Sequence, residues 1–362
     1  MIITLLLPNL SGGGAERVNL DLAYEFKSLG YEVEFVLCNM NGVFLPEAAT
    51  HFNVVDLNLT SIVQLPRRLA KYIDETKPDA VIASMWGVTA FTPFAKIMSR
   101  HKPTILLVEH NSLINQFKNS RKLLKIFLKI STYLSYRLSD QLGGVSLGVT
   151  QDMKILANLR NKPVEVLYNP IPSKLTAFGE EEFSKVWGDC SNRVLNVGSY
   201  KEQKNQKLLI KAFSMVSEEL DAKLIILGEG GLDDELKTQI ANLGLEKNVL
   251  LHSFVKDPSC FFQSADLFVL SSDREGFGNV IVEALSCGTP VVSTDCEHGP
   301  SEILNNGEFG TLVPVGDAEA LSTAIEESLS KTYDKQKLIN RARDFAPEVS
   351  AKRYLEVLGI EK

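Results

Sequence analysis

Residues 2–38, IITLLLPNLSGGGAERVNLDLAYEFKSLGYEVEFVLC, contain two short apolar runs joined by a segment with helical periodicity. The runs 2–7 and 32–38 have the length and composition of buried strands. The helix expected at 15–29 is long enough to cross one face of a sheet between them. The stretch therefore predicts a strand–helix–strand unit in which the two strands are parallel.

The alternation continues in two series separated by a polar, proline-containing break. The first series adds strands at 80–83, 104–108 and 141–145 and helices at 61–76 and 89–99. The second has strands at 194–197, 223–227, 249–251, 267–270 and 291–293 and helices at 205–219, 232–243, 258–264 and 279–287. Such alternation is typical of a parallel sheet with helices on both faces. We expect an α/β protein with two doubly wound, Rossmann-like domains facing across a cleft.

The break runs from 169 to 189 and includes three consecutive glutamates at 180–182. It divides the chain into an N-terminal domain, 1–171, and a C-terminal domain, 172–346. Doubly wound sheets bind ligands beyond the carboxyl ends of their strands, so functional residues are expected in the loops that follow strands.

The composition indicates a protein that is soluble or bound peripherally to a membrane. The chain has 362 residues, 44% of them hydrophobic. No apolar run approaches the roughly 18 residues that a transmembrane helix needs. The five cysteines lack the C-x-x-C spacing of zinc sites, which favours a reducing cytoplasm.

Charge is distributed unevenly along the chain. Residues 1–170 hold 18 Lys and Arg against 14 Asp and Glu, a balance of +4, and the remainder holds 20 against 31, a balance of −11. The basic first half suggests an anionic partner. Nucleic acid is not expected, because the excess is modest and no recognition motif accompanies it.

A glycine-rich turn, Ser11-Gly12-Gly13-Gly14, follows the first strand. Glycines let a ligand approach the backbone closely, and the N–H groups at the start of the next helix can bind a phosphate or diphosphate. A tight turn without a ligand explains the same residues equally well.

Two other strand ends carry titratable side chains. His110 follows strand 104–108 and could orient an acceptor hydroxyl, although a hydrogen-bonded structural histidine is the alternative. Lys204 lies in the loop after strand 194–197, where its ammonium could neutralise a diphosphate leaving group. A solvated surface lysine is the alternative there.

The most informative segment is 271–284, SSDREGFGNVIVEA. A helix is expected to begin at Asn279, so its first amides could bind a phosphate. Glu275 precedes this helix and Glu283 lies inside it. A carboxylate can accept hydrogen bonds from two sugar hydroxyls. A helix cap and a buried ion pair are the alternative for the two glutamates.

A metal site is not expected. Asp295-x-Glu297 resembles half of such a site, but two carboxylates without a third ligand are weak evidence for a divalent ion. No Asp-x-Asp triplet occurs in the chain. We therefore expect neither a metal nor another cofactor.

Together these segments resemble glycosyltransferase family 4, a family of GT-B enzymes. In chain order the resemblance is carried by Gly12-Gly13-Gly14-Ala15-Glu16-Arg17, Glu109-His110-Asn111, Tyr168-Asn169-Pro170, the loop from Gly198 to Lys204-Asn205, and Glu275-Gly276-Phe277-Gly278-Asn279 with Glu283-Ala284. It implies a retaining, metal-independent transferase in which the leaving phosphate deprotonates the acceptor. It also implies that the C-terminal segment, 347–362, packs back on the N-terminal domain.

The resemblance implies roles for individual residues. Catalysis falls to His110 near the acceptor, Glu275 at the donor sugar and Lys204 at the diphosphate. The donor-binding set that it implies is Gly13, Gly14, Ser199, Lys204, Phe254, Val255, Glu275, Gly276, Phe277, Gly278, Asn279 and Glu283. Within this set, Glu283 holds the ribose and the backbone at Phe254 and Val255 lies against the base. The chain departs from the family at Ser199, where an arginine is usual, and Lys201 is the candidate to replace that cation.

Residues 118–137 combine Arg121, Lys122, Lys125 and Lys129 with large apolar side chains at helical spacing. Such a helix can lie in an anionic membrane interface while its lysines reach the surface. An amphipathic helix packed on its own sheet fits the pattern equally well. Similar basic stretches in family members that act on polyprenyl-diphosphate sugars favour the membrane interpretation.

The sequence thus predicts a transferase of a hexose or N-acetylhexosamine from a nucleotide-diphosphate sugar, with UDP favoured. The acceptor is a glycan, with a polyprenyl-diphosphate-linked glycan as one option, in bacterial surface glycan or glycoprotein assembly. The expected location is cytoplasmic, including peripheral attachment to the inner face of the cytoplasmic membrane. A nucleotide-sugar 2-epimerase of similar fold and a non-catalytic GT-B binding subunit are the alternatives.

Overall fold

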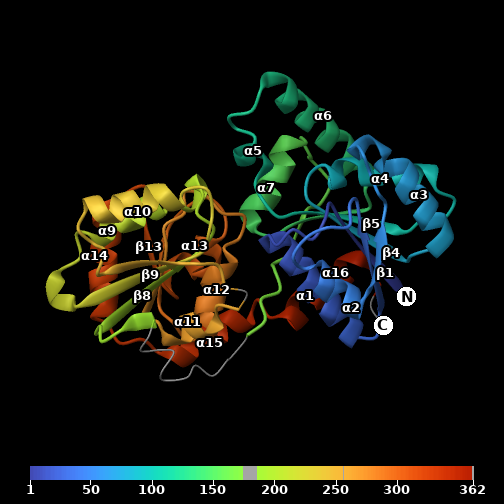
Figure 1. The fold of residues 1–362 in the computed structure, drawn as a ribbon. Helices are drawn as coiled ribbons and strands as arrows, with labels where there is room; N and C mark the ends of the chain where they lie inside the picture. Colours follow the sequence, from blue (N-terminus) through green and yellow to red (C-terminus); the bar gives the residue numbers. More distant parts are fainter. Residues whose placement is uncertain (174–185, 256, 361–362) are drawn as a thin grey trace. The chain divides into compact units, whose positions relative to one another are not determined.

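The computed structural model describes residues 1–173, 186–255 and 257–360 (Figure 1). The chain divides into two compact units, unit 1 with Met1–Ile171 and Pro347–Lys362 and unit 2 with Pro172–Ala346. These limits coincide with those expected from the sequence. The acidic run at 180–182 lies outside the described residues.

Unit 1 is built on a seven-stranded parallel sheet with the strand order β3-β2-β1-β4-β5-β6-β7. The strands are β1 (Ile2–Leu7), β2 (Glu32–Leu37), β3 (Asn53–Asp56), β4 (Ala80–Ser84), β5 (Thr104–Glu109), β6 (Gln141–Gly144) and β7 (Glu165–Val166). β1, β4 and β5 are almost entirely buried, as expected of strands covered on both faces.

Helices cover both faces of this sheet. They are α1 (Gly14–Ser28), α2 (Leu45–His51), α3 (Leu65–Thr76), α4 (Val88–Met98), α5 (Leu113–Gln116), α6 (Lys122–Leu138), α7 (Leu147–Leu156) and α16 (Pro347–Leu358). α4 packs between α3 and α6, whereas α1 packs against the C-terminal helix α16 on the other side of the sheet (Figure 1). The C-terminal helix therefore belongs to the N-terminal unit.

Unit 2 repeats this design with six parallel strands in the order β10-β9-β8-β11-β12-β13. They are β8 (Asn192–Val197), β9 (Ala222–Leu227), β10 (Val249–His252), β11 (Leu267–Leu270), β12 (Val291–Thr294) and β13 (Thr311–Val313). The helices are α9 (Gln206–Phe213), α10 (Asp233–Asn242), α11 (Ser259–Ser264), α12 (Asn279–Ser286), α13 (Pro300–Ile303), α14 (Ala318–Leu329) and α15 (Lys335–Arg343). α9 packs against α10 and α14, and α12 packs against α11, α13 and α15.

The strand order reverses once in each sheet. In unit 1 the chain builds the sheet outward from β1 through β2 and β3, and then outward in the other direction from β4. In unit 2 the same reversal lies between β8 and β11. Loops after the two strands at such a switch point diverge and leave a crevice for ligands.

One expected element is shorter in the structure. The helix expected at 205–219 is α9, which ends at Phe213, and a separate 3-10 turn spans Glu218–Leu220. The Ser214 hydroxyl bonds the carbonyl of Lys211 (2.7 Å), and the Ser217 hydroxyl caps the 3-10 turn. Serine hydroxyls compete with helical backbone bonds in this way, and periodicity alone did not reveal it.

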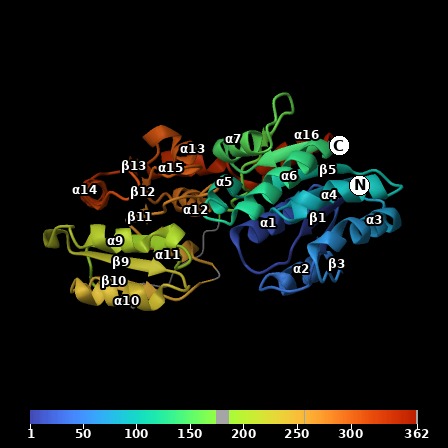
Figure 2. The same cartoon turned by 90° about the horizontal axis from the view of Figure 1, so that it is seen from above.

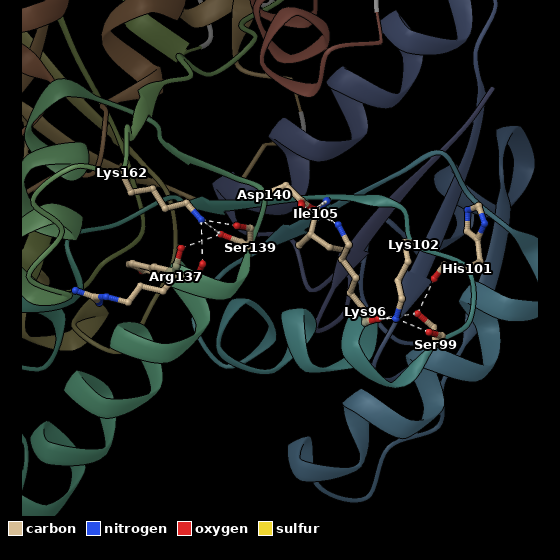
Figure 3. Close-up of polar contacts among 10 residues, drawn as sticks. Lys96, Ser99, His101, Lys102, Ile105, Arg137, Ser139, Asp140 and Lys162 are labelled. Carbon is tan, nitrogen blue, oxygen red and sulfur yellow. Dashed lines mark hydrogen bonds and ion pairs between the residues drawn. The ribbon is translucent and has the colours of Figure 1, made fainter.

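Several cations of unit 1 stabilise the fold, and Figure 3 shows the contacts of Lys96, Lys102 and Lys162. Lys96 of α4 pairs with Asp140 at 2.6 Å, and Lys102 donates to carbonyl groups near the C-terminus of α4. Lys162 donates to the carbonyl that follows α6. Arg137 donates to two carbonyl groups that follow α7. Part of the basic excess of the first half is therefore structural.

Substitutions of Tyr354 in α16 test how the C-terminal helix packs on unit 1. Its side chain is 1% exposed and its ring lies edge-on to Phe26, with 6.4 Å between ring centroids. Tyr354→Ala should lower the free energy of unfolding in urea by about 3–5 kcal/mol, as other large core deletions do. The buried hydroxyl has no hydrogen-bond partner among the described residues. Tyr354→Phe should therefore be neutral or stabilising by up to about 1 kcal/mol, and a loss as large as that of the alanine variant would contradict this packing.

Candidate functional site

Two loops meet at the switch point of unit 2. One follows β8 and spans 198–205, and the other follows β11 and spans 271–278. The backbone N–H of Asp273 donates to the carbonyl of Gln203 at 2.9 Å, and the Gln203 side-chain amide donates to the carbonyl of Arg274 at 2.9 Å. These bonds hold the two loops in register, although they are about 70 residues apart in the chain.

Lys204 and Glu275 form an ion pair between these loops. The Lys204 Nζ lies 2.6 Å from Glu275 Oε1, and the Ser272 hydroxyl donates to the same oxygen at 2.6 Å. The Glu275 side chain is 7% exposed and that of Lys204 21%. A buried carboxylate needs such partners to offset its desolvation. The fold thus brings together two residues that the sequence assigns to catalysis.

Both partners keep capacity for a ligand. An ammonium group has three N–H donors, and among the described residues Lys204 uses one of them, on Glu275. Asn205, the next residue, has a left-handed backbone (φ 45°), and its side chain caps α9. This conformation places the lysine directly before the N-terminus of α9, where an anion is favoured.

The glycines of 276–278 shape the turn into α12. Gly278 has φ 99°, a value that favours glycine, and it caps the helix. Phe277 is 2% exposed, and its ring packs edge-on against Phe345 at 5.4 Å. Phe277 could therefore contact a ligand only through its backbone. Glu283 lies inside α12 and is half-buried.

Gly299 is a further residue of this site that the sequence analysis did not single out. A Cβ atom at this position would lie 1.7 Å from the carbonyl oxygen of Phe277, so only glycine fits. Its position in a polar loop directly after a strand was the available signal.

Further cations surround the ion pair. Ser199 is half-buried, and its carbonyl accepts from the Gln206 side chain at 3.1 Å. Lys201 is exposed, and its ammonium has no partner among the described residues. Arg274, which sequence reasoning did not select, is exposed beside Glu275. The two loops thus carry two exposed cations, and Lys201 lies two residues from Ser199, the position at which the family usually has an arginine.

Phe254 and Val255 follow β10, at the same edge of the sheet. Phe254 is 56% exposed and Val255 is half-buried. β10 is three strand positions away from β11 in the sheet, which corresponds to about 14 Å. A ligand that reaches both loops must span about that length.

The glycine-rich turn of unit 1 differs from the expected empty anion site. Glu16 is buried, and its carboxylate accepts hydrogen bonds from the backbone N–H groups of Gly13 and Glu16 itself. Burial raises the pKa of Glu16. Gly13 is the N-cap of α1 and Glu16 its third residue, so Glu16 supplies the carboxylate half of a capping box, while glycine has no side chain for the other half. A phosphate at Gly13 and Gly14 would have to displace this carboxylate.

His110 follows β5 at the carboxyl edge of the unit 1 sheet. Its side chain is buried, and neither ring nitrogen has a hydrogen-bond partner among the described residues. Burial lowers the pKa of His110 to about 4, so the imidazole is neutral near pH 7. A neutral imidazole can accept a hydrogen bond from an acceptor hydroxyl.

Glu109, directly before His110, fixes this strand end in place. Its carboxyl accepts from the hydroxyls of Thr89 in α4 (2.6 Å) and Tyr136 in α6 (3.0 Å). Burial raises the pKa of Glu109 to about 7. The sequence analysis gave Glu109 no role, and its place beside His110 was the only signal.

The basic helix is α6, which packs on its own domain, and its contact with a membrane stays a prediction. Its inner residues, including Leu128 and Thr132, are buried, and α6 packs against α4 and α7. Its outer residues are exposed, namely Arg121, Lys122, Leu123, Lys125, Ile126, Phe127, Lys129 and Ile130. The proposed membrane-contacting stretch extended to residue 137, but Tyr136 is fully buried and Arg137 is bound to carbonyl groups. Tyr136 therefore cannot belong to such a surface, whereas Arg137 is exposed with its guanidinium held by these carbonyl groups.

The described residues hold neither a candidate metal cluster nor a membrane-spanning helix. Within 1–173, 186–255 and 257–360, no three or more His, Cys, Asp or Glu side chains are grouped to hold a metal ion. In the same residues no helix is long and apolar enough to span a membrane. Metal independence stays a prediction.

Two family models match the chain in succession, Glycosyltransferase Family 4 over residues 12–175 and Glycosyl transferases group 1 over 178–345. A similar protein is the N-acetylgalactosamine-N,N'-diacetylbacillosaminyl-diphospho-undecaprenol 4-alpha-N-acetylgalactosaminyltransferase of Campylobacter jejuni, 30% identical over 94% of each chain. Another is the N-acetyl-alpha-D-glucosaminyl L-malate synthase of Bacillus anthracis, 23% identical over 92% of this chain and 89% of that one.

Solved structures agree with this family. Anabaena HepE in complex with UDP has a TM-score of 0.84 at 23% identity and covers 99% of this chain and 100% of its own. WaaG, a glycosyltransferase involved in lipopolysaccharide biosynthesis, has a TM-score of 0.72 at 16% identity, with 99% and 100% covered. At these identities the likeness shows the fold. From the two family matches and the Campylobacter relative, the chain belongs to glycosyltransferase family 4, with the GT-B fold, and is a glycosyltransferase.

Proposed function

We propose that this enzyme transfers a hexose or N-acetylhexosamine from a UDP-sugar to a polyprenyl-diphosphate-linked glycan, with retention of configuration and without a metal. The observation that carries the proposal is the Lys204–Glu275 pair at the switch point of unit 2. It supplies a cation for a diphosphate and a carboxylate for sugar hydroxyls within one crevice.

The donor lies along the carboxyl edge of the unit 2 sheet. The sugar hydroxyls bond Glu275, the diphosphate lies at Lys204, and the base reaches Phe254, about 14 Å from the Glu275 loop. Glu283 in α12 accepts the ribose hydroxyls. UDP is favoured because HepE, which shares the fold, was solved with UDP.

The chemistry follows from a cation at the leaving group. The bond between the sugar C1 and the diphosphate breaks, and the acceptor oxygen forms its bond to C1 on the same face. The acceptor proton passes to the leaving phosphate. Lys204 stabilises the charge that develops there, and Lys201 is the candidate to replace the cation of the absent arginine, with Arg274 exposed in the neighbouring loop.

The acceptor is assigned to unit 1. The Campylobacter relative is named for a diphospho-undecaprenol acceptor. In this chain α6 exposes lysines together with Leu123, Ile126, Phe127 and Ile130, a combination suited to an anionic lipid surface. His110, neutral and unpartnered among the described residues, is placed to contact the acceptor hydroxyl. The Gly13-Gly14 turn stays a candidate diphosphate contact, conditional on Glu16 moving.

The 2-epimerase alternative requires no acceptor. Incubating the enzyme with UDP-N-acetylhexosamines and a polyprenyl-diphosphate-linked saccharide should yield labelled lipid, and free UDP should appear only when the acceptor is present. Conversion of the UDP-sugar to its 2-epimer without acceptor would favour the epimerase instead. Absence of any turnover would favour the non-catalytic subunit.

Substitutions in the ion pair test the donor site. Lys204→Ala and Glu275→Gln should each reduce kcat for transfer of radiolabelled sugar by about 100-fold or more, as removal of a single charge-stabilising group does in other enzymes. Lys207→Ala is the matched control, because in the part of the chain that the structure describes Lys207 pairs only with Glu202 and Glu235, at the surface. It should change kcat less than about twofold. Unchanged transfer in both site variants would overturn the assignment.

Chelation tests metal independence. Transfer in excess EDTA should stay within about twofold of the untreated rate, because lysine and arginine side chains supply the positive charge at the diphosphate. A loss of activity that Mg²⁺ or Mn²⁺ restores would show that a metal takes part.

Vesicle binding tests the role of α6. Lys122→Glu with Lys125→Glu should weaken binding to vesicles containing anionic phospholipid at least about tenfold, since each cation near such a surface contributes about 1 kcal/mol. Lys71→Glu with Lys352→Glu reverses two exposed charges elsewhere in unit 1 and should change binding little. Equal losses in both pairs would indicate a net-charge effect, and persistence in the α6 pair would place the interface elsewhere.

A further inference from the structure

A groove separates α6 from α5 and α7 in unit 1. It encloses about 780 Å³ and is lined by Ile114 and Phe117 of the α5 region, by Ile130 and Tyr133 of α6, and by Ile155 of α7. Figures 1 and 2 show these three helices as neighbours. The volume falls within the roughly 300–1,000 Å³ that small-molecule sites occupy.

The groove is apolar at its lips as well as at its floor. Leu128 at the floor is buried, whereas Ile130 on one lip is 55% exposed and Ile155 on the other is 70% exposed. A flat bilayer surface could cover the outer face of α6, but it could not fill a concave space between two helices. A single flexible hydrocarbon chain has the shape to do so.

Cations accompany this apolar lining. Lys118, Lys125 and Lys129 line the same groove, and no Asp or Glu occurs between Glu109 and Asp140. Lys125 is bonded to the carbonyl of Lys118, whereas the Lys129 ammonium has no partner among the described residues. The complementary occupant is therefore an amphiphile with an apolar chain and an anionic head.

The groove is close to the proposed acceptor position. Ile114 follows His110 by four residues, so the two backbones lie within about 14 Å. The Ser112 hydroxyl caps α5 and bonds Asp152 of α7, which fixes this wall relative to the strand end.

We infer that the groove binds the prenyl chain of the lipid-linked acceptor itself, next to its diphosphate. This inference rests on the proposed function, because it takes the acceptor to be a polyprenyl-diphosphate-linked glycan. It gives α5 and α7 a role in acceptor recognition, although neither helix belongs to the surface of α6 that is proposed to contact the membrane. The groove would select acceptors by chain length even where no membrane is present.

Water-soluble acceptors that differ only in chain length test this inference. With neither vesicles nor detergent, the KM for the acceptor should fall about tenfold or more as the chain grows from one isoprene unit to four, because each added unit buries apolar surface. The KM for the donor should not change. The Ile130→Ser/Ile155→Ser double variant should lose this chain-length dependence.

Ile126→Ser is the matched control. Ile126 is an exposed isoleucine of the same helix that does not line the groove, so this variant should keep the chain-length dependence. The inference is overturned if the acceptor KM of the wild-type enzyme does not change with chain length, or if that of the double variant still does. Either result would leave the proposed function intact.

Failure of the proposed function gives a different result, namely no transfer to any of these acceptors. In that case the groove is tested separately, by comparing the change in Tm that geranylgeranyl diphosphate causes with the change that inorganic diphosphate causes. A shift that needs the prenyl chain and disappears in the double variant supports it. Equal shifts for the two compounds, or for the two proteins, reject it.

Discussion

All strands in each sheet run in the same direction, and the arrangement of functional residues depends on this constraint. Parallel strands bring all their carboxyl ends to one edge, so residues far apart in the chain become neighbours there. Lys204 and Glu275 are 71 residues apart, yet their side-chain atoms are 2.6 Å from each other. The strand order reverses between β8 and β11, and such a switch point is where doubly wound sheets bind ligands.

The two units use the same topology but differ in charge at the switch point. In unit 1, the carboxylate of Glu16 occupies the amides at the N-terminus of α1. In unit 2, a lysine precedes α9 and further cations lie exposed in the same loops. An anion is therefore favoured in unit 2 and opposed in unit 1. This difference supports the assignment of the donor diphosphate to unit 2 and of the acceptor to unit 1, and a phosphate contact from Gly13 would require Glu16 to rotate away.

Much of this organisation could be predicted from the sequence, for a simple reason. Buried parallel strands are short apolar runs, and a lysine or glutamate directly after such a run must lie at the carboxyl edge of the sheet. Contacts that depend on side-chain direction could not be predicted in this way. Glu109 directly precedes the predicted residue His110, and Ser272 lies three residues before the predicted residue Glu275. Their hydrogen bonds, however, depend on side-chain rotamers and on the neighbouring helices. The capping role of Glu16 could have been found from its position three residues after Gly13.

The basic helix shows why pattern alone left two interpretations open. Amphipathic periodicity identifies one apolar stripe, whereas α6 has apolar side chains on more than one side. Its inner side is held by specific polar contacts, with Tyr136 bonded to Glu109 and the Trp86 indole donating to Ser131 at 3.3 Å. Trp86 also packs edge-on against Phe117 and Phe127. These contacts hold the helix from its inner side, whereas Leu123, Ile126 and Ile130 on its outer side remain exposed. Exposed apolar surface of this kind favours association and persists where a partner covers it. The buried carboxyl group of Glu109 therefore positions His110 and also holds α6, the helix that presents this apolar surface. Glu109 thereby links the proposed catalytic end of the acceptor site to its proposed lipid end within unit 1.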